Sequence, residues 1–386
     1  LNVSNGAALV TTPDTGQILA MIGSVDYFDT AHDGQVNLTT SLRQPGSSVK
    51  PFNYALAFEK GFTPSDSIED SPVTFSTPGS PPWVPKNYDG RFHGTITLRT
   101  ALASSYNIPA IKLLARNGVP QMAKLATDLG ISTWDDPSRL GLSLTLGGIE
   151  VKMTDMATAY SAFANYGTPI SLNPILKVTD NNDQPLAFSP CLLDSSSTAI
   201  SAHAQSCLSQ NVLTHRTAYF INDILSDSLA RAPAFGSHSI LNLPNVAVKT
   251  GTSNDLRDNW TIGYTPSVLV ATWVGNNDNA PMSGVASGIT GASPIWAKIM
   301  ADLIKDKPQA FYLPDDLIKV AICPLTKTLT CPACSSLTRQ EVFTKGTQPK
   351  VACNNDTITK LIEERQAQQA LQAANKILDG ASTTRD

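Results

Sequence analysis

Apolar residues recur along this chain of 386 residues with two different periods, which separate predicted strands from predicted helices. Short apolar runs bounded by turn residues predict strands at 7–12, 17–22, 246–249, 260–264 and 268–274. Apolar residues three and four positions apart predict helices at 47–60, 110–117, 153–164, 217–229 and 295–303. Strands therefore stand at both ends of the first 305 residues, with most of the helices between them. This order predicts an α+β domain whose antiparallel sheet is built from N- and C-terminal strands with a large helical insert.

Two stretches lack both periods and are predicted to be irregular. Residues 63–90 contain six prolines, which block regular structure, and residues 170–210 are rich in serine. Beyond residue 305 there follow a segment with four of the six cysteines and a tail rich in Gln and Ala, with a helical pattern at 358–378. We therefore expect three parts: a main domain at 1–305, a cysteine-containing module at 306–354, and a polar helical or disordered tail at 355–386.

Composition narrows the possible partners. An apolar fraction of 41% is enough to build a core, which excludes a wholly disordered chain. The net charge is −4 and no run of Lys and Arg forms a stripe for phosphates, so we expect no nucleic-acid partner. No apolar run reaches the roughly 20 residues needed to cross a bilayer. The chain opens with Leu1 close to a predicted strand, so we expect a trimmed chain whose signal, membrane anchor or further domain would precede it.

The six cysteines fall into two local groups: Cys191 and Cys207, then Cys323, Cys331, Cys334 and Cys353. An even number in local groups suits disulfides in an oxidising compartment. The second group also suits a four-thiolate zinc site, because Cys331-Pro-Ala-Cys334 has the spacing of zinc ligands. Free thiols are the third possibility, and the residues themselves leave all three open.

Three short motifs stand in a fixed order: Ser47-Ser48-Val49-Lys50, Ser105-Tyr106-Asn107 and Lys249-Thr250-Gly251-Thr252. Ser47 and Lys50 open a predicted helix, so at positions i and i+3 they share one face. The Lys-Thr-Gly triplet ends a predicted strand, where a glycine such as Gly251 would let a substrate backbone approach closely. The order and placement of the three motifs point to one site.

A serine nucleophile needs a base within hydrogen-bond reach. The five histidines lie in no catalytic motif, and the chain has no Gly-x-Ser-x-Gly elbow. A lysine serves as the base only when burial or a nearby second cation lowers its pKa, and Lys249 is the expected second cation for Lys50. The alternatives are a solvated lysine on a helix surface for Lys50, and helix-capping roles for Ser105 and Asn107.

These motifs and their surroundings closely resemble those of class A penicillin-binding proteins. Residues 43–52 resemble the active-site serine motif, residues 97–110 the second motif, and residues 249–266 the third. Smaller matches lie at 83–88, 146–151 and 294–296. The resemblance covers about residues 6–303. It covers the cysteine region and the tail poorly, so it implies nothing for them.

The resemblance implies a D-alanyl-D-alanine transpeptidase that cross-links peptidoglycan stem peptides through an acyl-serine and is inhibited by β-lactams. In the family pattern Ser47 is the nucleophile, Lys50 accepts its proton, and Ser105 passes a proton to the leaving nitrogen. The resemblance also implies a substrate amide contact for Asn107, positive potential from Lys249 and substrate contacts at Gly251. Thr250 and Thr252 would contact the terminal carboxylate of the substrate. The backbone N–H groups of Ser47 and Thr252 would form the oxyanion hole.

The same resemblance implies the cellular setting. The partners would be a D-Ala-D-Ala donor, an amine acceptor, and β-lactams as covalent inhibitors, with no metal or other cofactor. The parent chain would be membrane-anchored and carry a glycosyltransferase domain. The expected location is the extracytoplasmic side of the bacterial cytoplasmic membrane, in the periplasm or at the cell surface.

Three other functions share part of this chemistry. A serine β-lactamase of one large class needs a Glu in an E-x-x-L-N segment, and Glu59, Glu69, Glu150 and Glu341 all stand in other contexts. A D,D-carboxypeptidase would hand the acyl group to water instead of an amine. A non-catalytic β-lactam sensor domain would also be acylated, but the length and the class A surroundings of this chain disfavour it.

Overall fold

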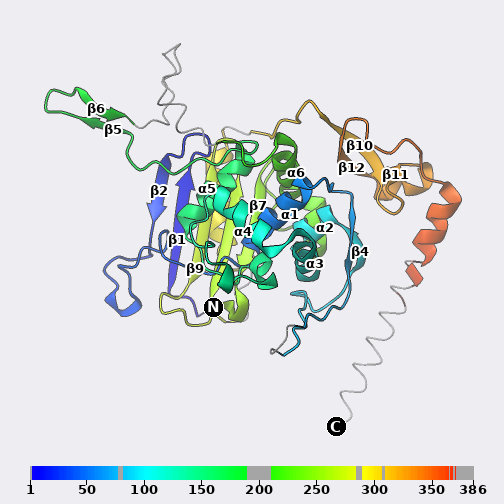
Figure 1. Cartoon of the computed structure of the whole chain (residues 1–386), viewed down its shortest axis with the longest axis horizontal. Coiled ribbons are helices and arrows are strands. Elements are labelled where there is room, and N and C mark those ends of the chain that lie inside the picture. Colours follow the sequence, from blue (N-terminus) through cyan, green and yellow to red (C-terminus); the bar gives the residue numbers. More distant parts are fainter. Residues whose placement is uncertain are drawn as a thin grey trace, which may run out of the picture. The chain divides into compact units, whose positions relative to one another are not determined.

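Strands from the two ends of the first 314 residues pair in one antiparallel sheet of order β2-β1-β9-β8-β7 in the computed structural model (Figure 1). The strands are β1 (Asn5–Thr11), β2 (Ile18–Ile22), β7 (Ala247–Thr252), β8 (Asp258–Tyr264) and β9 (Leu269–Gly275). The N-terminal strand β1 pairs with β9 in register from Asn5↔Gly275 to Thr11↔Leu269. The predicted α+β fold with a sheet from both ends is confirmed.

The structure describes residues 2–76, 81–188, 210–283, 289–306, 309–364, 366, 367 and 370. Cys191, Cys207 and the tail beyond residue 370 lie outside the described residues, and so does most of the serine-rich stretch. The chain divides into two compact units, Leu1–Pro314 and Asp315–Asp386. No helix among the residues described has the length and apolar character that a membrane crossing requires.

Helix α8 (Ser293–Ile304) covers one face of the sheet. Its Trp296 and Met300 lie in one hydrophobic cluster with Val10 of β1 and Val248 of β7. Gly263 on β8 lies against this helix, because a Cβ at that position would be 2.3 Å from the Trp296 ring. The close approach of helix and sheet therefore depends on this glycine.

Helices α1 (Lys50–Glu59), α5 (Met153–Ala164) and α6 (His215–Ser226) pack on the opposite side, with α5 against β1 and β9 and α6 against β7 (Figure 1). The Tyr160 ring of α5 meets Tyr264 of β8 edge to face at 5.8 Å, and Phe52 of α1 stacks on Phe163 at 6.1 Å. The Tyr264 hydroxyl donates to Asn222 Oδ1 of α6 at 2.7 Å. Aromatic packing with satisfied polar ends fixes these helices on the sheet.

The rest of the helical insert is α2 (Leu98–Ala103), α3 (Asn107–Asn117), α4 (Val119–Asp128), η3 (Pro137–Arg139) and η4 (Leu142–Leu146). Buried amides lock α1 to α3. Asn53 Nδ2 donates to the Ala110 carbonyl at 2.8 Å, and Asn117 Nδ2 donates to both the carbonyl and the Oδ1 of Asn53 at 2.8 Å. This lock holds the start of α1 in a fixed place relative to the start of α3.

Several predicted boundaries were wrong because pairing with a partner strand overrides the pattern of a single segment. The irregular stretch 63–90 contains β3 (Ser67–Asp70), which pairs with β4 (Gly94–Thr97), and the stretch 170–210 contains a hairpin of β5 (Lys177–Thr179) and β6 (Pro185–Phe188). The strand predicted at 246–249 continues to Thr252, paired with β8 throughout. The Lys-Thr-Gly triplet therefore lies within a strand and not at its end.

Two predicted helices also differ. The helix at 47–60 begins as a 3-10 turn, η2 (Gly46–Val49), before α1. The helix at 217–229 ends at Ser226, and Asp227 starts α7 (Ser228–Phe235) by accepting from the Ala230 N–H at 2.9 Å. Asp227 adopts extended backbone angles, which break the run that a single period had suggested.

The second unit contains a three-stranded sheet of order β11-β10-β12, from β10 (Leu317–Cys323), β11 (Thr328–Leu329) and β12 (Arg339–Thr344), together with η7 (Pro332–Leu337). Residues 355–364 are helical, earlier than the predicted start at 358. Disulfides join Cys323 to Cys334 and Cys331 to Cys353. Of the three possibilities for these four cysteines, the structure has disulfides, so no thiolates remain there to bind zinc.

Candidate active site

The three motifs meet at one cavity of about 640 Å³ in the first unit. The cavity is lined by Ser47 of η2, by Ser105 just before α3 and Asn107 at its start, and by Thr250 and Thr252 of β7. The second and third motifs, which lie far from the serine turn in sequence, thus each supply one wall of the cavity. The sequence prediction that the motifs form one site agrees with this geometry.

Three glycines let three backbone segments close around the serine turn. Gly46 has φ +54°, and a Cβ there would lie 2.4 Å from the Thr252 carbonyl oxygen. Gly147 has φ +73°, and its Cβ would lie 2.3 Å from the Gly46 nitrogen. A Cβ at Gly251 would lie 2.1 Å from the Pro45 carbonyl oxygen. The backbone that approaches Gly251 is therefore the chain's own, where the sequence had suggested a substrate backbone.

The two adjacent serines have different surroundings. Ser48 is fully buried, and its hydroxyl donates to the Pro45 carbonyl at 2.7 Å. Its own carbonyl accepts from the Tyr160 hydroxyl at 2.5 Å. Ser47 is half-buried and lines the cavity. Because η2 is a 3-10 turn, Ser47 and Lys50 at i and i+3 are nearly eclipsed, so the predicted shared face holds for a different reason.

Lys50 is the first residue of α1 and is fully buried, so the alternative of a solvated surface lysine is wrong. Its ammonium donates to the carbonyl oxygens of Ser105 at 2.6 Å and Tyr106 at 3.2 Å, and to Asn107 Oδ1 at 2.7 Å. Burial, and next the charge of Lys249, hold the pKa of Lys50 well below its usual range. Three acceptors match the three protons of an ammonium, so Lys50 must lose one of them before it can accept another.

Lys249 on β7 is also buried and faces the second motif. Its ammonium donates to Ser105 Oγ at 2.7 Å and to the Thr250 carbonyl at 2.8 Å. Burial, and next the charge of Arg231, lower the pKa of Lys249 to about 7. The expected role of Lys249 as a second cation for Lys50 agrees with the electrostatics of the site.

Ser105 bridges the two lysines. It lies between α2 and α3 with φ +59°, a left-handed conformation that is strained for a residue other than glycine. Its carbonyl accepts from Lys50 and its hydroxyl accepts from Lys249. Ser105 therefore caps no helix, since Tyr106 occupies the N-cap position of α3. The strained conformation points both of its oxygens at cations.

Asn107 is the first residue of α3, one position after the cap. Its side-chain amide already bonds within the chain, since Oδ1 accepts from Lys50 and Nδ2 donates to the Lys86 carbonyl at 2.9 Å. Its backbone N–H donates to Asn87 Oδ1 at 2.8 Å. One N–H of the amide remains for the substrate contact that the family resemblance implies.

The motifs alone did not reveal Asn259 and Arg231. Asn259 of β8 is buried, and its Nδ2 donates to Thr252 Oγ1 at 3.2 Å while its Oδ1 accepts from the Ala292 N–H at 2.8 Å. It holds the last threonine of β7 in place. The sequence signal that could have identified Asn259 was its position next to Trp260, within the segment that resembles the third motif.

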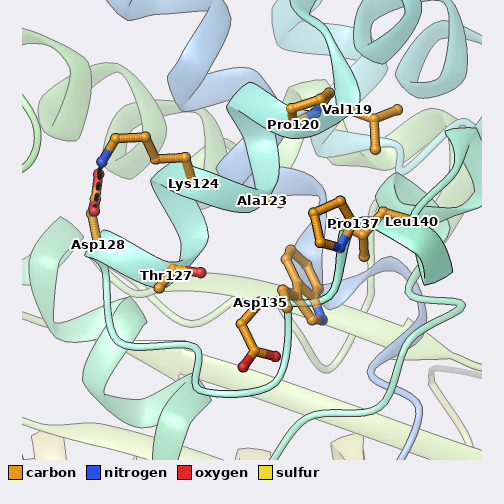
Figure 2. Close-up of a pocket in the computed structure, with 10 residues that line it drawn as sticks. Val119, Pro120, Ala123, Lys124, Thr127, Asp128, Asp135, Pro137 and Leu140 are labelled. Atoms are coloured by element: carbon orange, nitrogen blue, oxygen red, sulfur yellow. Dashed lines mark hydrogen bonds and ion pairs between the residues drawn. The ribbon is translucent and has the colours of Figure 1, made fainter.

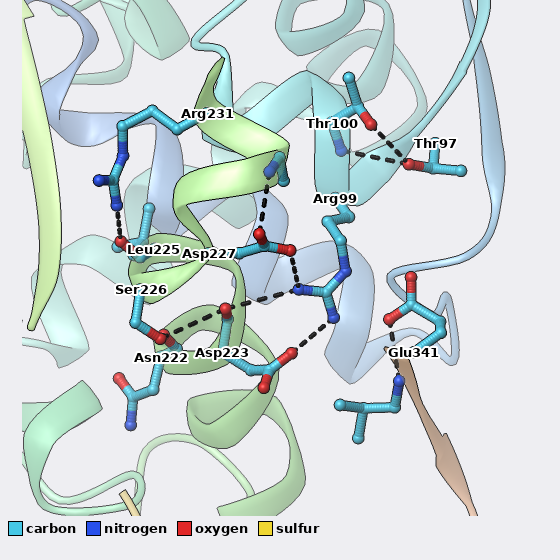
Figure 3. A network of polar contacts seen from close by, with 12 residues as sticks. Thr97, Arg99, Thr100, Asn222, Asp223, Leu225, Ser226, Asp227, Arg231 and Glu341 are labelled. Atoms are coloured by element: carbon cyan, nitrogen blue, oxygen red, sulfur yellow. Dashed lines mark hydrogen bonds and ion pairs between the residues drawn. The ribbon is translucent and has the colours of Figure 1, made fainter. Parts of the chain in front are cut away.

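Arg231 of α7 is a buried cation behind Lys249. Its guanidinium donates to the Leu241 carbonyl and Asn242 Oδ1, both at 3.0 Å. It also donates to the Leu225 carbonyl (Figure 3). In the same network Arg99 of α2 pairs with Asp223 at 2.6 Å and Asp227 at 3.1 Å. No sequence signal marked Arg231, because α7 itself was not predicted.

Two other features lie apart from this site. Of the histidines in the described ranges, none lines the cavity, and His203 falls outside those ranges. A second cavity of about 390 Å³ lies on α4, with Val119, Pro120 and Ala123 on one side and Pro137 and Leu140 on the other (Figure 2). It contains no residue of the three motifs, so the chemistry belongs to the first cavity.

Family models match both units. Residues 6–301 match the penicillin binding protein transpeptidase domain, and residues 313–357 match the penicillin-binding protein 1A, C-terminal domain. The penicillin-binding protein 1A of Rickettsia conorii is 32% identical over 336 residues, which covers 84% of this chain and 41% of that protein. That of Neisseria meningitidis is 33% identical over 306 residues, which covers 78% of this chain and 36% of that protein. The chain spans about two fifths of the length of these relatives.

Solved structures agree with the sequence relatives. The crystal structure of penicillin-binding protein 1A from Haemophilus influenzae has a TM-score of 0.76 and 29% identity, covering 91% of this chain and 54% of that chain. The PonA1 protein from Mycobacterium tuberculosis, in complex with penicillin V, has a TM-score of 0.65 and 22% identity over 80% of each chain, which shows a shared fold. The chain therefore belongs to the penicillin-binding protein transpeptidase family, in its class A branch.

Proposed function

We propose that this chain carries the D-alanyl-D-alanine transpeptidase activity that cross-links peptidoglycan stem peptides. The observation that supports it most is Ser105 bridging two buried lysines beside the cavity that Ser47 lines. This arrangement supplies a nucleophile, a lysine whose pKa is lowered toward a base, and a hydroxyl for proton transfer. It needs no histidine.

In the proposed reaction, Ser47 Oγ attacks the carbonyl carbon of the penultimate D-Ala, and neutral Lys50 accepts the hydroxyl proton. The C–N bond to the terminal D-Ala breaks as Ser105 passes a proton to its nitrogen, and the proton that Lys50 accepted from Ser47 resupplies Ser105. Lys249, whose ammonium donates to Ser105 Oγ, keeps its proton and supplies positive potential. An amine of a second stem peptide then attacks the acyl-serine ester, and the proton it loses returns the serine hydroxyl. The products are a new amide, free D-Ala and unchanged enzyme.

The backbone N–H groups of Ser47 and Thr252 are the proposed oxyanion hole. The closeness that Gly46 permits between η2 and β7 supports this assignment, because a Cβ there would meet the Thr252 nitrogen at 2.6 Å. Loss of one such donor typically removes about 2.7–4 kcal/mol of transition-state stabilisation. The hydroxyls of Thr250 and Thr252, with the charge of Lys249, would bind the terminal carboxylate, since charge-assisted hydrogen bonds are the stronger kind.

The relatives support the setting proposed for the whole protein. Among the structural neighbours, PonA1 is in complex with penicillin V, and penicillin-binding protein A from Mycobacterium tuberculosis forms a ceftriaxone acyl-enzyme. We expect the same covalent inhibition by β-lactams here. We also propose that the parent protein is membrane-anchored on the extracytoplasmic side and carries a glycosyltransferase domain in the length that this chain does not span.

The experiment is intact-mass spectrometry after a pulse of benzylpenicillin, followed over time. Long-lived acylation is expected, whereas fast loss of the adduct would favour a β-lactamase. Turnover of a D-Ala-D-Ala pentapeptide with and without an amine acceptor separates the remaining candidates. Release of D-Ala to water alone would favour a carboxypeptidase, and acylation with no peptide turnover would favour a sensor domain.

The matched variants are Ser47→Ala and Ser48→Ala. We expect the first to abolish the adduct, because it removes the nucleophile. The second removes only the buried hydroxyl that bonds to Pro45, so acylation should persist. An adduct mapped to Ser48, or a Ser47→Ala protein that still acylates at the normal rate, would contradict the proposal.

A further inference from the structure

His93 lies just before β4, outside the three motifs, and its ring makes three close contacts. Nδ1 lies 2.6 Å from Asp70 Oδ2, and Nε2 lies 3.1 Å from Asp89 Oδ2. The face of the ring stacks on Tyr106, with the ring centroids 3.9 Å apart and an angle of 19° between the planes. One side chain thus joins β3, the loop before β4, and the N-cap of α3.

The two carboxylates have different surroundings. Asp70 is fully buried, and Asn87 Nδ2 donates to both of its oxygens at 2.8 Å. The His93 backbone N–H adds a further bond at 3.0 Å. Asp89 is more open, with 42% of its side chain exposed. Nδ1 of His93 is hydrogen-bonded to Asp70, and Nε2 lies close to Asp89. The ring therefore forms a bridge between one fixed carboxylate and one at the surface.

This bridge connects directly to the acceptors of the buried lysine. Tyr106, on which His93 stacks, gives its carbonyl to Lys50 at 3.2 Å. Asn87, which holds Asp70, also accepts from the N–H groups of Asn107 at 2.8 Å and Ile108 at 3.1 Å. The same few residues thus fix both the position of the His93 ring and the start of α3.

The bridge also borders the cavity. Asp89 and Tyr106 both line it, beside Tyr88 and Arg91 of the same loop. The loop of residues 88–91 is therefore a rim of the cavity, and the contact from His93 to Asp89 ties that rim to the second motif.

We propose that His93 is a positioning residue for acylation: its ring, bonded to Asp70, close to Asp89 and stacked on Tyr106, holds the rim of residues 88–91 and the second motif together, and so places the acceptors of Lys50. The proposal rests on the proposed function of Ser47 and Lys50. The titratable groups facing His93 are Asp70 of β3, Asp89 of the rim, and Tyr106 at the start of α3.

The test uses His93→Phe, which keeps a ring over Tyr106 but removes both ring nitrogens, and Asp89→Ala, which removes only the contact of Nε2 at the surface. Matched controls are His238→Gln, an exposed histidine outside the cavity lining, and Asp128→Ala, which removes an exposed i,i+4 pair with Lys124. The readout is the second-order rate constant of acylation by a fluorescent penicillin at one fixed pH, with the melting temperature recorded for each variant.

We expect both test variants to acylate about tenfold more slowly than wild type, because misplaced catalytic groups lose about that much or more. His93→Gln, which restores one donor, should recover part of that loss, as a positioning role requires. Both controls should acylate at the wild-type rate.

Normal acylation with only a lowered melting temperature, or no recovery of the rate in His93→Gln, would overturn the inference and leave the proposed function intact. Should His93→Phe fail to fold, Asp89→Ala decides alone, since that side chain is partly exposed. A wild-type protein that is not acylated at all would overturn the proposed function together with this inference.

Discussion

Replacing Gly46 by alanine tests whether the close contact between the serine turn and β7 builds the site. The new Cβ would meet three backbone atoms of Thr252, at 2.4 Å from the oxygen, 2.5 Å from the carbon and 2.6 Å from the nitrogen. Backbone atoms of a paired strand cannot rotate away as a flexible side chain can. The turn and the strand must therefore separate.

Two penalties add at this position. The left-handed conformation, φ +54°, costs an alanine about 1–2 kcal/mol. Overpacking against a fixed backbone adds about 1–3 kcal/mol. Gly61→Ala is the matched control, because Gly61 also has a positive φ, +93°, but has nothing within 4 Å of its Cβ. The difference between the two variants isolates the contact, at about 1–3 kcal/mol of unfolding free energy.

Urea unfolding followed by tryptophan fluorescence reports on the first unit, Leu1–Pro314, because all five tryptophans lie within it. Acylation by a fluorescent penicillin is the second assay. Separating Ser47 from Thr252 displaces the proposed oxyanion donors, so Gly46→Ala should acylate about 10²–10³-fold more slowly. Gly61→Ala should acylate normally. Equal stability losses for the two variants, or normal acylation by Gly46→Ala, would refute the reasoning.

The remaining predictions concern charge. Acylation should fall as the pH drops, because a protonated Lys50 cannot accept the serine proton; a rate that is flat from pH 5 to 8 would exclude Lys50 as the base. Arg231→Met removes a cation that lowers the pKa of Lys249, so the pKa of Lys249 should rise above about 7. KM for carboxylate-bearing substrates should then start to increase at a higher pH than in wild type. An increase of KM that begins at the same pH in both proteins would contradict this. Combined Thr250→Val and Thr252→Val substitutions should slow acylation by a β-lactam acid far more than by its methyl ester, and equal losses for both compounds would remove the threonines from the carboxylate role.

Local pattern was enough for the parts of this protein that depend on local chemistry. The helix predicted at 153–164 is α5 with the same bounds, because an apolar face with clear ends needs no distant partner to be recognised. The order of strands, helices and strands predicted a sheet closed from both ends of the unit. The three motifs marked the residues that meet at the cavity, since each carries unusual residue types at close spacing.

Tertiary structure alone decided the properties that make those residues a site. Whether Lys50 is solvated or buried depends on how α3 packs against α1. That packing uses the hydrogen bond between Asn53 and Asn117, which are 64 residues apart in sequence. Ser105 has a left-handed backbone, and its carbonyl and hydroxyl oxygens accept from two lysines on different elements. Arg231, His93 and strand β3 carried no local signal, since their roles come from partners distant along the chain. Periodicity and motifs are read from neighbours in sequence, whereas burial, charge and strain are set by neighbours in space.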